Sequence, residues 1–152
     1  MAETIFDKIV SGDLPSWPIW EDDKHLAFLT PFPNTPGATV VIPKTNPGDY
    51  IFDLEASAQA ELLTAATTVA KLLEKALDTP RVAMVFEGTG VAHVHAKLYP
   101  LHGTLGAQTE VGSSHTEFYP TYVGYLTTVE GAKMPDADLA ALQAKITAVS
   151  AS

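Results

Sequence analysis

The stretch Val91-Ala92-His93-Val94-His95-Ala96-Lys97-Leu98-Tyr99-Pro100 decides the fold, because two kinds of side chain alternate along it. Successive side chains of an extended strand leave on opposite faces, so the stretch predicts a strand with two unlike faces. The apolar face consists of Ala92, Val94, Ala96 and Leu98. The other face consists of Val91, His93, His95, Lys97 and Tyr99. Neighbouring Cα atoms on one face lie roughly 6.6 Å apart, so two imidazoles and an ammonium can converge on one phosphate-sized anion.

The segments on either side of this strand favour a functional site. Glu87-Gly88-Thr89-Gly90 precedes the strand as a tight turn in which glycine permits unusual backbone angles. Pro100 ends the strand after the last polar side chain. Histidine and lysine also occur on solvated strand faces that have no task, which is the alternative interpretation. Because a turn precedes the strand and a proline ends it, a functional site is the better interpretation.

The amino-terminal part predicts a short helix and then three strands. Thr4 is the expected N-cap, with Asp7 three residues later, and Gly12 is the expected end of the helix. The predicted strands cover residues 17–20, 24–29 and 39–42.

Residues 56–77 predict one long helix with a wide apolar face. The apolar residues at helical spacing are Leu62, Leu63, Ala66, Val69, Ala70, Leu72, Leu73, Ala76 and Leu77. Asp78-Thr79-Pro80 ends this helix, and residues 82–86 predict an apolar strand just before the alternating one. An antiparallel sheet of about five strands, with one long helix and shorter terminal helices, is an α+β fold.

The carboxyl-terminal third is less regular. Residues 101–120 are rich in Gly, Ser and Thr and predict a long loop that could lie over an active site. The histidines of this loop are His102 and His115. Residues 122–128 predict a further strand, and residues 136–149 predict a terminal helix capped by Asp136.

The composition is typical of a small soluble enzyme. At 152 residues the chain suits a single domain over residues 1–152, with its core at 4–100. Because there is no cysteine, we expect neither disulfides nor a thiolate metal site, and a reducing cytoplasm is the expected compartment. No apolar run is long enough to span a membrane. The net charge of −9 argues against nucleic acid as a partner, because binding to its backbone needs clustered cations.

The pattern His93-x-His95-x-Lys97 resembles the histidine triad (HIT) motif, with lysine at the position of the third histidine. Other segments resemble HIT proteins in order and spacing. They are Ile5-Phe6-Asp7-Lys8-Ile9 with Gly12 and Pro15, Glu21-Asp22-Asp23 with Leu26-Ala27-Phe28, and Pro36-Gly37 before Val40-Val41-Ile42-Pro43-Lys44. The resemblance covers residues 4–100 and implies a HIT-like fold.

The resemblance implies a nucleotide-binding hydrolase that cleaves at the α-phosphate of a nucleoside phosphate conjugate, such as a dinucleoside polyphosphate or a phosphoramidate. It implies that His95 attacks phosphorus and forms a nucleotidyl-histidine. His93 would orient the site and share its protons, and Lys97 would hold the non-bridging oxygens as a fixed charge. The implied nucleotide-binding residues are Ile5, Phe6 and Ile9 around adenine, together with Thr30, Thr89 and Gly90. No cofactor is implied as a requirement, although a metal ion could arrive bound to the nucleotide.

Four positions depart from the HIT pattern. Ala38 stands where many members have a histidine, and Thr30 stands where they have the aspartate that holds the ribose hydroxyls. Gly90 replaces a serine or threonine that helps to protonate the leaving group, and Phe86 replaces a frequent asparagine. Members with glutamine at the third motif position transfer nucleotidyl groups, so loss of the third histidine can redirect the chemistry without abolishing it.

Other functions remain open at this stage. Since a lysine ordinarily titrates near about 10.4, Lys97 would relay no proton to help water, and a nucleotidyl adduct could accumulate. That favours a nucleotidyltransferase or phosphorylase with an acceptor other than water. A catalytically weak nucleotide-binding module is a further alternative, as is a metal site in which His93 and His95 join His102 or His115.

The sequence also predicts assembly. The long helix has more apolar residues than one sheet face needs, and HIT proteins that resemble this chain are commonly homodimers. A homodimer with two-fold symmetry is therefore expected.

Overall fold

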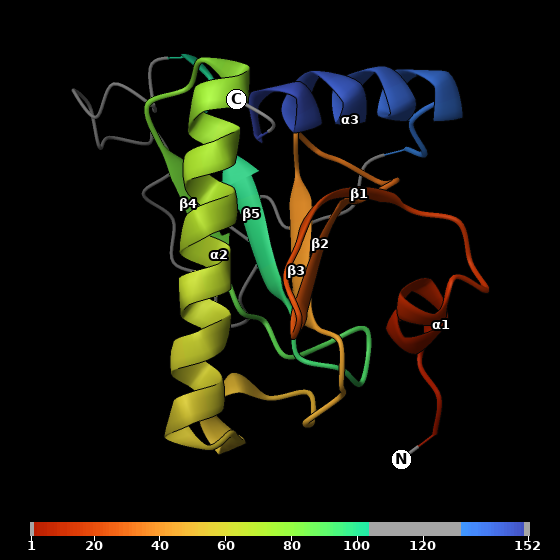
Figure 1. Ribbon diagram of the computed structural model, residues 1–152, viewed down its shortest axis with the longest axis vertical. Coiled ribbons are helices and arrows are strands. Elements are labelled where there is room, and N and C mark those ends of the chain that lie inside the picture. Colours follow the sequence, from red (N-terminus) through yellow and green to blue (C-terminus); the bar gives the residue numbers. More distant parts are fainter. Residues whose placement is uncertain (1, 104–131, 151–152) are drawn as a thin grey trace, which may run out of the picture.

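The computed structural model of the protein describes residues 2–103 and 132–150. Five strands form one antiparallel sheet in the order β1-β2-β3-β5-β4 (Figure 1). The strands are β1 (Trp17–Glu21), β2 (His25–Leu29), β3 (Thr39–Pro43), β4 (Val82–Val85) and β5 (Ala96–Pro100). The helices are α1 (Ile5–Ser11), α2 (Ala56–Leu77) and α3 (Asp136–Ser150), with a short 3₁₀ turn η1 (Ile51–Asp53) before α2. The predicted α+β fold is confirmed.

One face of the sheet packs against α2 and α3. Figure 1 shows α2 running along this face, while α3 lies crosswise near one end of the sheet. The long helix has the predicted bounds, and its apolar side is buried against the strands. Buried residues of α2 are Leu62, Ala65, Ala66, Val69, Leu72, Leu73 and Ala76. Leu139 and Ile146 of α3 complete this core, in which Ala96 and Leu98 of β5 are also buried.

The opposite face of the sheet is only partly covered, by α1. The predicted cap of this helix is confirmed, because Thr4 and Asp7 form a capping box and Gly12 ends the helix with a φ of 85°. Phe6 is the buried residue of α1 and packs with Phe28 and other apolar side chains of β2 and β3. Since α1 has only seven residues, it leaves part of this face uncovered.

The predicted strand over residues 91–99 is wrong in its first half. The strand begins only at Ala96, and the preceding residues follow a turn in which the His93 N–H donates to the Val91 carbonyl at 2.8 Å. The Val94 N–H donates to the Gly48 carbonyl at 2.7 Å, so this residue bonds to a loop and not to a strand. Alternation along a sequence cannot reveal that a distant loop has taken the place of a ladder partner.

The structure also changes the prediction for the start of α3. Asp136 is the first residue of the helix and not its cap, because the N–H groups of Asp138 and Leu139 donate to the Pro135 carbonyl. The Met134 N–H donates to the Pro31 carbonyl at 2.9 Å and ties this segment to the end of β2.

Parts of the carboxyl-terminal third fall outside the described residues. These parts are the predicted strand over 122–128, His115, and the predicted loop beyond residue 103. Among the helices that are described, none is long and apolar enough to cross a membrane.

Candidate active site

A pocket of about 480 Å³ lies on the face of the sheet that α1 leaves partly uncovered. Most of the predicted site residues line it together. They are Ile5, Phe6, Ile9, Thr30, Thr89, Gly90, His95 and Lys97. His93 does not line the pocket and is fully buried. The sequence therefore identified residues that meet in space, although they come from α1, the residue after β2, the segment before β5 and β5 itself.

The part of the pocket next to α1 is apolar. The rings of Phe6 and Phe28 meet edge to face with their centroids 5.7 Å apart, and Val40 of β3 lies in the same cluster. Ile5 and Ile9 also line the pocket, and Ile5 remains 51% exposed. Aromatic and branched side chains of this kind offer a surface that suits a flat, weakly polar ring.

His95 is held in one tautomer by the main chain. Its Nδ1 lies 2.8 Å from the His93 carbonyl oxygen, which can only accept, so Nδ1 carries the proton and donates. Burial lowers the pKa of His95, and the nearby Lys97 ammonium lowers it further. The ring is therefore neutral at pH 7, and its Nε2 has a free electron pair on a residue that lines the pocket.

The ring of His93 is fully buried against Phe6 of α1, which also contacts the ring of His95. Its Nε2 donates to the Pro43 carbonyl at 2.7 Å, while its Nδ1 lies 3.5 Å from Thr4 Oγ1 and 3.7 Å from Asp7 Oδ1. Burial lowers the pKa of His93, which favours the neutral ring. Both motif histidines lie on one side of the sheet as expected, because both rings meet Phe6 of α1 edge to face, with centroids 5.7 Å (His93) and 5.2 Å (His95) from it. They differ in exposure, since His93 is fully buried there and His95 lines the pocket. His93 meets His95 through its main-chain carbonyl.

Lys97 has a partner that the sequence analysis missed. Its Nζ lies 2.7 Å from Oε1 of Glu87, and each side chain keeps about a quarter of its surface exposed, at 23% and 26%. Val85 of β4 pairs with Lys97, so Glu87, two residues beyond, lies beside the start of β5. Recognising β4 and β5 as an antiparallel pair joined by the Gly-rich turn would have predicted this ion pair.

The turn that shapes the histidines is held by residues with no local signal in the sequence. The Asn46 side chain donates to the Ala92 carbonyl at 2.8 Å and accepts from the Gly48 N–H at 3.0 Å. The Gly48 carbonyl then accepts from Val94. Asn46 is therefore a positioning residue for the histidine segment, and only the folded chain reveals it.

The four departures from the HIT pattern have distinct surroundings. Ala38 is buried and lines the pocket. Thr30 also lines the pocket, and its Oγ1 accepts from the Phe32 N–H at 3.2 Å. Gly90 has a φ of 90°, a conformation that strains any other residue. Phe86 packs against the core between the sheet and α2.

The alternative of a metal site gains no support from the part of the chain that the structure describes. No three His, Cys, Asp or Glu side chains of that part group closely enough to hold an ion. His102 bonds through Nε2 to the Pro36 carbonyl, and His93 through Nε2 to the Pro43 carbonyl. The variant of this hypothesis that uses His115 falls outside the described residues. The described donor set does not fit zinc, which takes three or four ligands from a protein.

The chain resembles known proteins in sequence and in structure. It is 29% identical over 120 residues to Protein hit of Bacillus subtilis, covering 76% of this chain and 82% of that protein. It is 47% identical over 47 residues to an adenylylsulfatase of Arabidopsis thaliana, covering 31% of this chain and 32% of that protein. It superposes on a zinc-bound histidine triad family protein of Mycobacterium smegmatis with a TM-score of 0.69 at 23% identity, covering 97% and 92% of the two chains.

The family comparison covers the motif and most of the residues that line the pocket. The model of the HIT domain matches residues 11–103, which include all five strands and both motif histidines. The chain therefore belongs to the HIT domain family.

Proposed function

We propose that the pocket binds a nucleoside phosphate conjugate and that the protein cleaves it at the α-phosphorus. The observation that supports this proposal most strongly is the hydrogen bond from His95 Nδ1 to the His93 carbonyl. It leaves Nε2 as an uncharged nucleophile beside a cation, Lys97, and an apolar wall that suits a base. The similarity to a protein named adenylylsulfatase agrees with a nucleotidyl substrate.

The first chemical step uses this nucleophile. His95 Nε2 attacks the α-phosphorus, a nitrogen–phosphorus bond forms, and the bond from phosphorus to the leaving group breaks with the electron pair moving to the leaving group. The Lys97 ammonium stabilises the charge that develops on the non-bridging oxygens. Glu87 keeps that ammonium in one position, since the two side chains are 2.7 Å apart. The products are the free leaving group and a nucleotidyl-His95.

The second step regenerates His95. Water attacks the same phosphorus, the nitrogen–phosphorus bond breaks, and a nucleoside monophosphate is released while the water proton passes to solvent. Because Lys97 is an ion-paired cation, it offers no base to activate that water. This ion pair favours a second candidate function, in which phosphate or an amine accepts the nucleotidyl group, as in a phosphorylase or nucleotidyltransferase.

Resident metal is not part of the proposal. The described residues present two motif histidines with no third ligand, and His93 Nε2 is already bonded to the Pro43 carbonyl. A metal ion bound to the phosphates of the substrate would be a component of the substrate.

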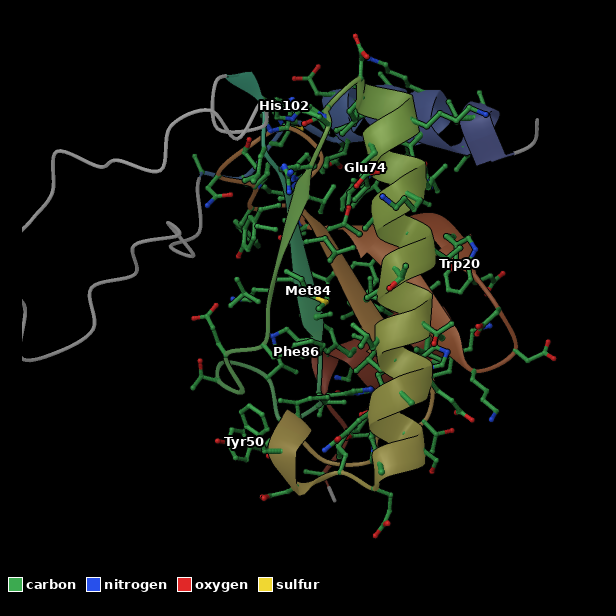
Figure 2. All side chains as sticks on the ribbon, turned by 90° about the vertical axis from the view of Figure 1, so that its left-hand side faces the viewer. Trp20, Tyr50, Glu74, Met84, Phe86 and His102 are labelled. Carbon is green, nitrogen blue, oxygen red and sulfur yellow. The ribbon has the colours of Figure 1, made fainter. Side chains whose placement is uncertain are left out.

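We propose further that the protein works as a homodimer in the reducing cytoplasm, the expected compartment of a chain that has no cysteine to form disulfides. The long helix α2 gives little support to the dimer, because it buries most of its apolar side chains within the chain. Leu63 is its one exposed large apolar residue. The β4 edge gives better support. Figure 2 faces this edge, along which Met84, Phe86 and Tyr50 follow one another. Light scattering that gives the chain mass of 16.2 kDa would contradict the dimer.

A mass-spectrometric screen tests the proposed function. Wild type and His95→Ala are incubated with dinucleoside polyphosphates, nucleoside phosphoramidates and nucleotide sugars, with and without phosphate. We expect wild type to release a nucleoside monophosphate, or a nucleoside diphosphate when phosphate is the acceptor, and we expect the variant to release neither. Binding without product over hours would show a nucleotide-binding module instead. Absence of both binding and product would overturn the proposal.

A further inference from the structure

A second pocket, of about 360 Å³, lies on the α2 side of the sheet, opposite to the candidate active site. Trp20, Asp22, Lys24 and His25 line it from the hairpin of β1 and β2, and Glu61 lines it from the first half of α2. Figure 2 shows Trp20 beside this helix. None of these residues lines the candidate active site, so the two pockets are separate.

The imidazole of His25 is the most buried polar group of this second pocket, with its side chain only 6% exposed. Its Nδ1 lies 3.2 Å from Asp22 Oδ1, which only accepts, so Nδ1 carries the proton of the neutral ring. The same carboxylate oxygen accepts from the N–H groups of Lys24 and His25 at 2.8 and 2.6 Å, which fixes its position. In the neutral ring, Nε2 therefore has a free electron pair.

This electron pair faces the second pocket. Nε2 of His25 has no hydrogen-bond partner among the described residues. None of the fully buried polar side-chain atoms of those residues lacks a partner, so Nε2 is not sealed inside the protein. Because His25 lines the pocket, the pocket is where a ligand can reach this atom.

The charges around the pocket favour a cation. Asp22 and Glu61 supply two carboxylates, whereas Lys24 is the one cation among the described lining residues. Its Nζ lies 2.7 Å from Glu61 Oε1, and the Lys24 side chain is 66% exposed. An ion pair this exposed is weak, so a ligand can replace it. The net charge of −9 on the whole chain also attracts cations.

A primary ammonium group has the chemistry that this pocket lacks. Its N–H groups donate to an imidazole electron pair and form charge-assisted hydrogen bonds with carboxylates. The indole of Trp20 offers an aromatic wall, and aromatic faces attract cations. A metal ion fits less well, because no three His, Asp or Glu side chains of the described residues group closely enough to hold one.

We propose that the second pocket binds the primary ammonium group of a small free amine, through His25 Nε2 and the Glu61 carboxylate, and that Lys24 is the internal cation that competes with it. A small amine suits the pocket because the acceptor nitrogen is almost entirely buried and the volume is modest. The inference does not depend on the proposed function, since it concerns the other side of the sheet.

The test is an NMR titration at pH 8, where imidazoles are ordinarily neutral, that follows the Trp20 indole N–H and the His25 ring C–H signals. The probes are butylamine, N-acetyl-lysine amide, acetate and phosphate. We expect butylamine to move both sets of signals and to bind at least as tightly as the lysine amide. Acetate and phosphate should leave the signals in place.

Variants of the ion pair sharpen this test. Lys24→Met should bind butylamine about threefold more tightly, because the competing ammonium is gone, and Glu61→Gln about threefold more weakly, the size of one exposed ion pair. Lys71→Met and Glu74→Gln are the controls. They make the same changes in another ion pair of α2, outside the pocket, and should bind as wild type does.

Four results would overturn the inference. Weaker butylamine binding in Lys24→Met, or signals that move with acetate or phosphate alone, would show an anion site. Equal responses of Lys24→Met and Lys71→Met would mean that only the net charge matters. Tighter binding of the lysine amide than of butylamine would assign the pocket to a lysine side chain of another protein. Signals that stay in place with every probe would show that the pocket binds none of these groups.

Discussion

The two halves of the Val91–Pro100 stretch follow the same alternating pattern but are shaped by different contacts. The second half is β5, which pairs with β3 on one side and β4 on the other and alternates between buried and partly exposed residues. The first half bonds to the loop around Asn46 and Gly48. Both motif histidines lie in this first half. The two histidine rings nevertheless lie on the α1 side and Val94 lies in the core on the α2 side, so side chains alternate in both halves. The contacts of the turn decide instead how deeply each histidine is buried.

This difference gives the two histidines different tasks. His93 is fully buried, and its carbonyl holds the ring of His95, whereas His95 lines the pocket with its Nε2 unprotonated. In the second half, Lys97 points to the pocket as the strand pattern predicts and is fixed by Glu87. We therefore place the nucleophile in the turn half and the fixed charge in the strand half.

The largest expected effect is on the nucleophile. His95→Ala should lower turnover by several orders of magnitude while nucleotide binding persists, because the lost atom forms a bond to phosphorus. Single-turnover kinetics with a substrate found in the screen measure this loss. His102→Ala is the control, since His102 does not line the pocket. Activity of His95→Ala within tenfold of wild type would show that another group attacks.

The next largest effect concerns the strand half. Lys97→Met should lower turnover about a hundredfold, as loss of one donor to a developing oxyanion does. Glu87→Gln should have a smaller effect, because the ammonium remains but loses its tether. Steady-state kinetics at saturating substrate measure both variants.

The pH profiles of these two variants sharpen the test. His95 must be neutral to attack, and because burial lowers its pKa, activity should stay constant down to a pH below about 6.5 before it falls. Lys97 lowers the pKa of His95 and Glu87 raises it. The acid limb should therefore move to higher pH in Lys97→Met and to lower pH in Glu87→Gln. Movement of both limbs in the same direction would contradict this account of the charges.

Stability should depend on pH through the same histidines. Burial lowers the pKa values of His93 and His95, so below about pH 6.5 the unfolded chain takes up protons that the folded chain does not. The free energy of unfolding should therefore be greatest above that pH and fall as the pH falls toward 5. Urea titrations measure the slope, which should be shallower in His95→Gln and unchanged in His102→Gln. An equal slope in all three proteins would contradict the prediction.

The smallest effect concerns the loop that shapes the turn half. Asn46→Ala removes the bonds to Ala92 and Gly48 and should lower the free energy of unfolding by about 1 kcal/mol, with a modest fall in turnover. Asn46→Asp keeps an acceptor for the Gly48 N–H and should lose less. Urea denaturation measures both. Unchanged stability and turnover in Asn46→Ala would mean that other contacts orient the histidines.

Local patterns in the sequence were sufficient for most of the fold. The capping residues Thr4 and Gly12 and the apolar spacing of 56–77 predict α1 and α2 because both depend on neighbours along the chain. Strand alternation holds for β5, where ladder partners flank the strand. Asp136 was expected as a cap, but Pro135 supplies the carbonyl that begins α3.

The site was predictable only in part. The resemblance to HIT proteins brought together α1, Thr30 and the motif, and these residues do line one pocket. Asn46 and Glu87 were missed because each acts through a contact with a residue far along the chain or on another element. Their roles, like those of His95 and Lys97, remain predictions for the experiments above.

The central claim is that His95 Nε2 forms a bond to phosphorus, and mapping of a trapped adduct tests it most directly. Wild type is mixed with substrate, quenched in alkaline denaturant at times spanning one turnover, digested and analysed by mass spectrometry. We predict a nucleotidyl group on His95 that rises and then decays, and that decays faster when phosphate is added. A nucleotidyl group on any other residue, or complete conversion to product with no adduct at any time, would contradict the account.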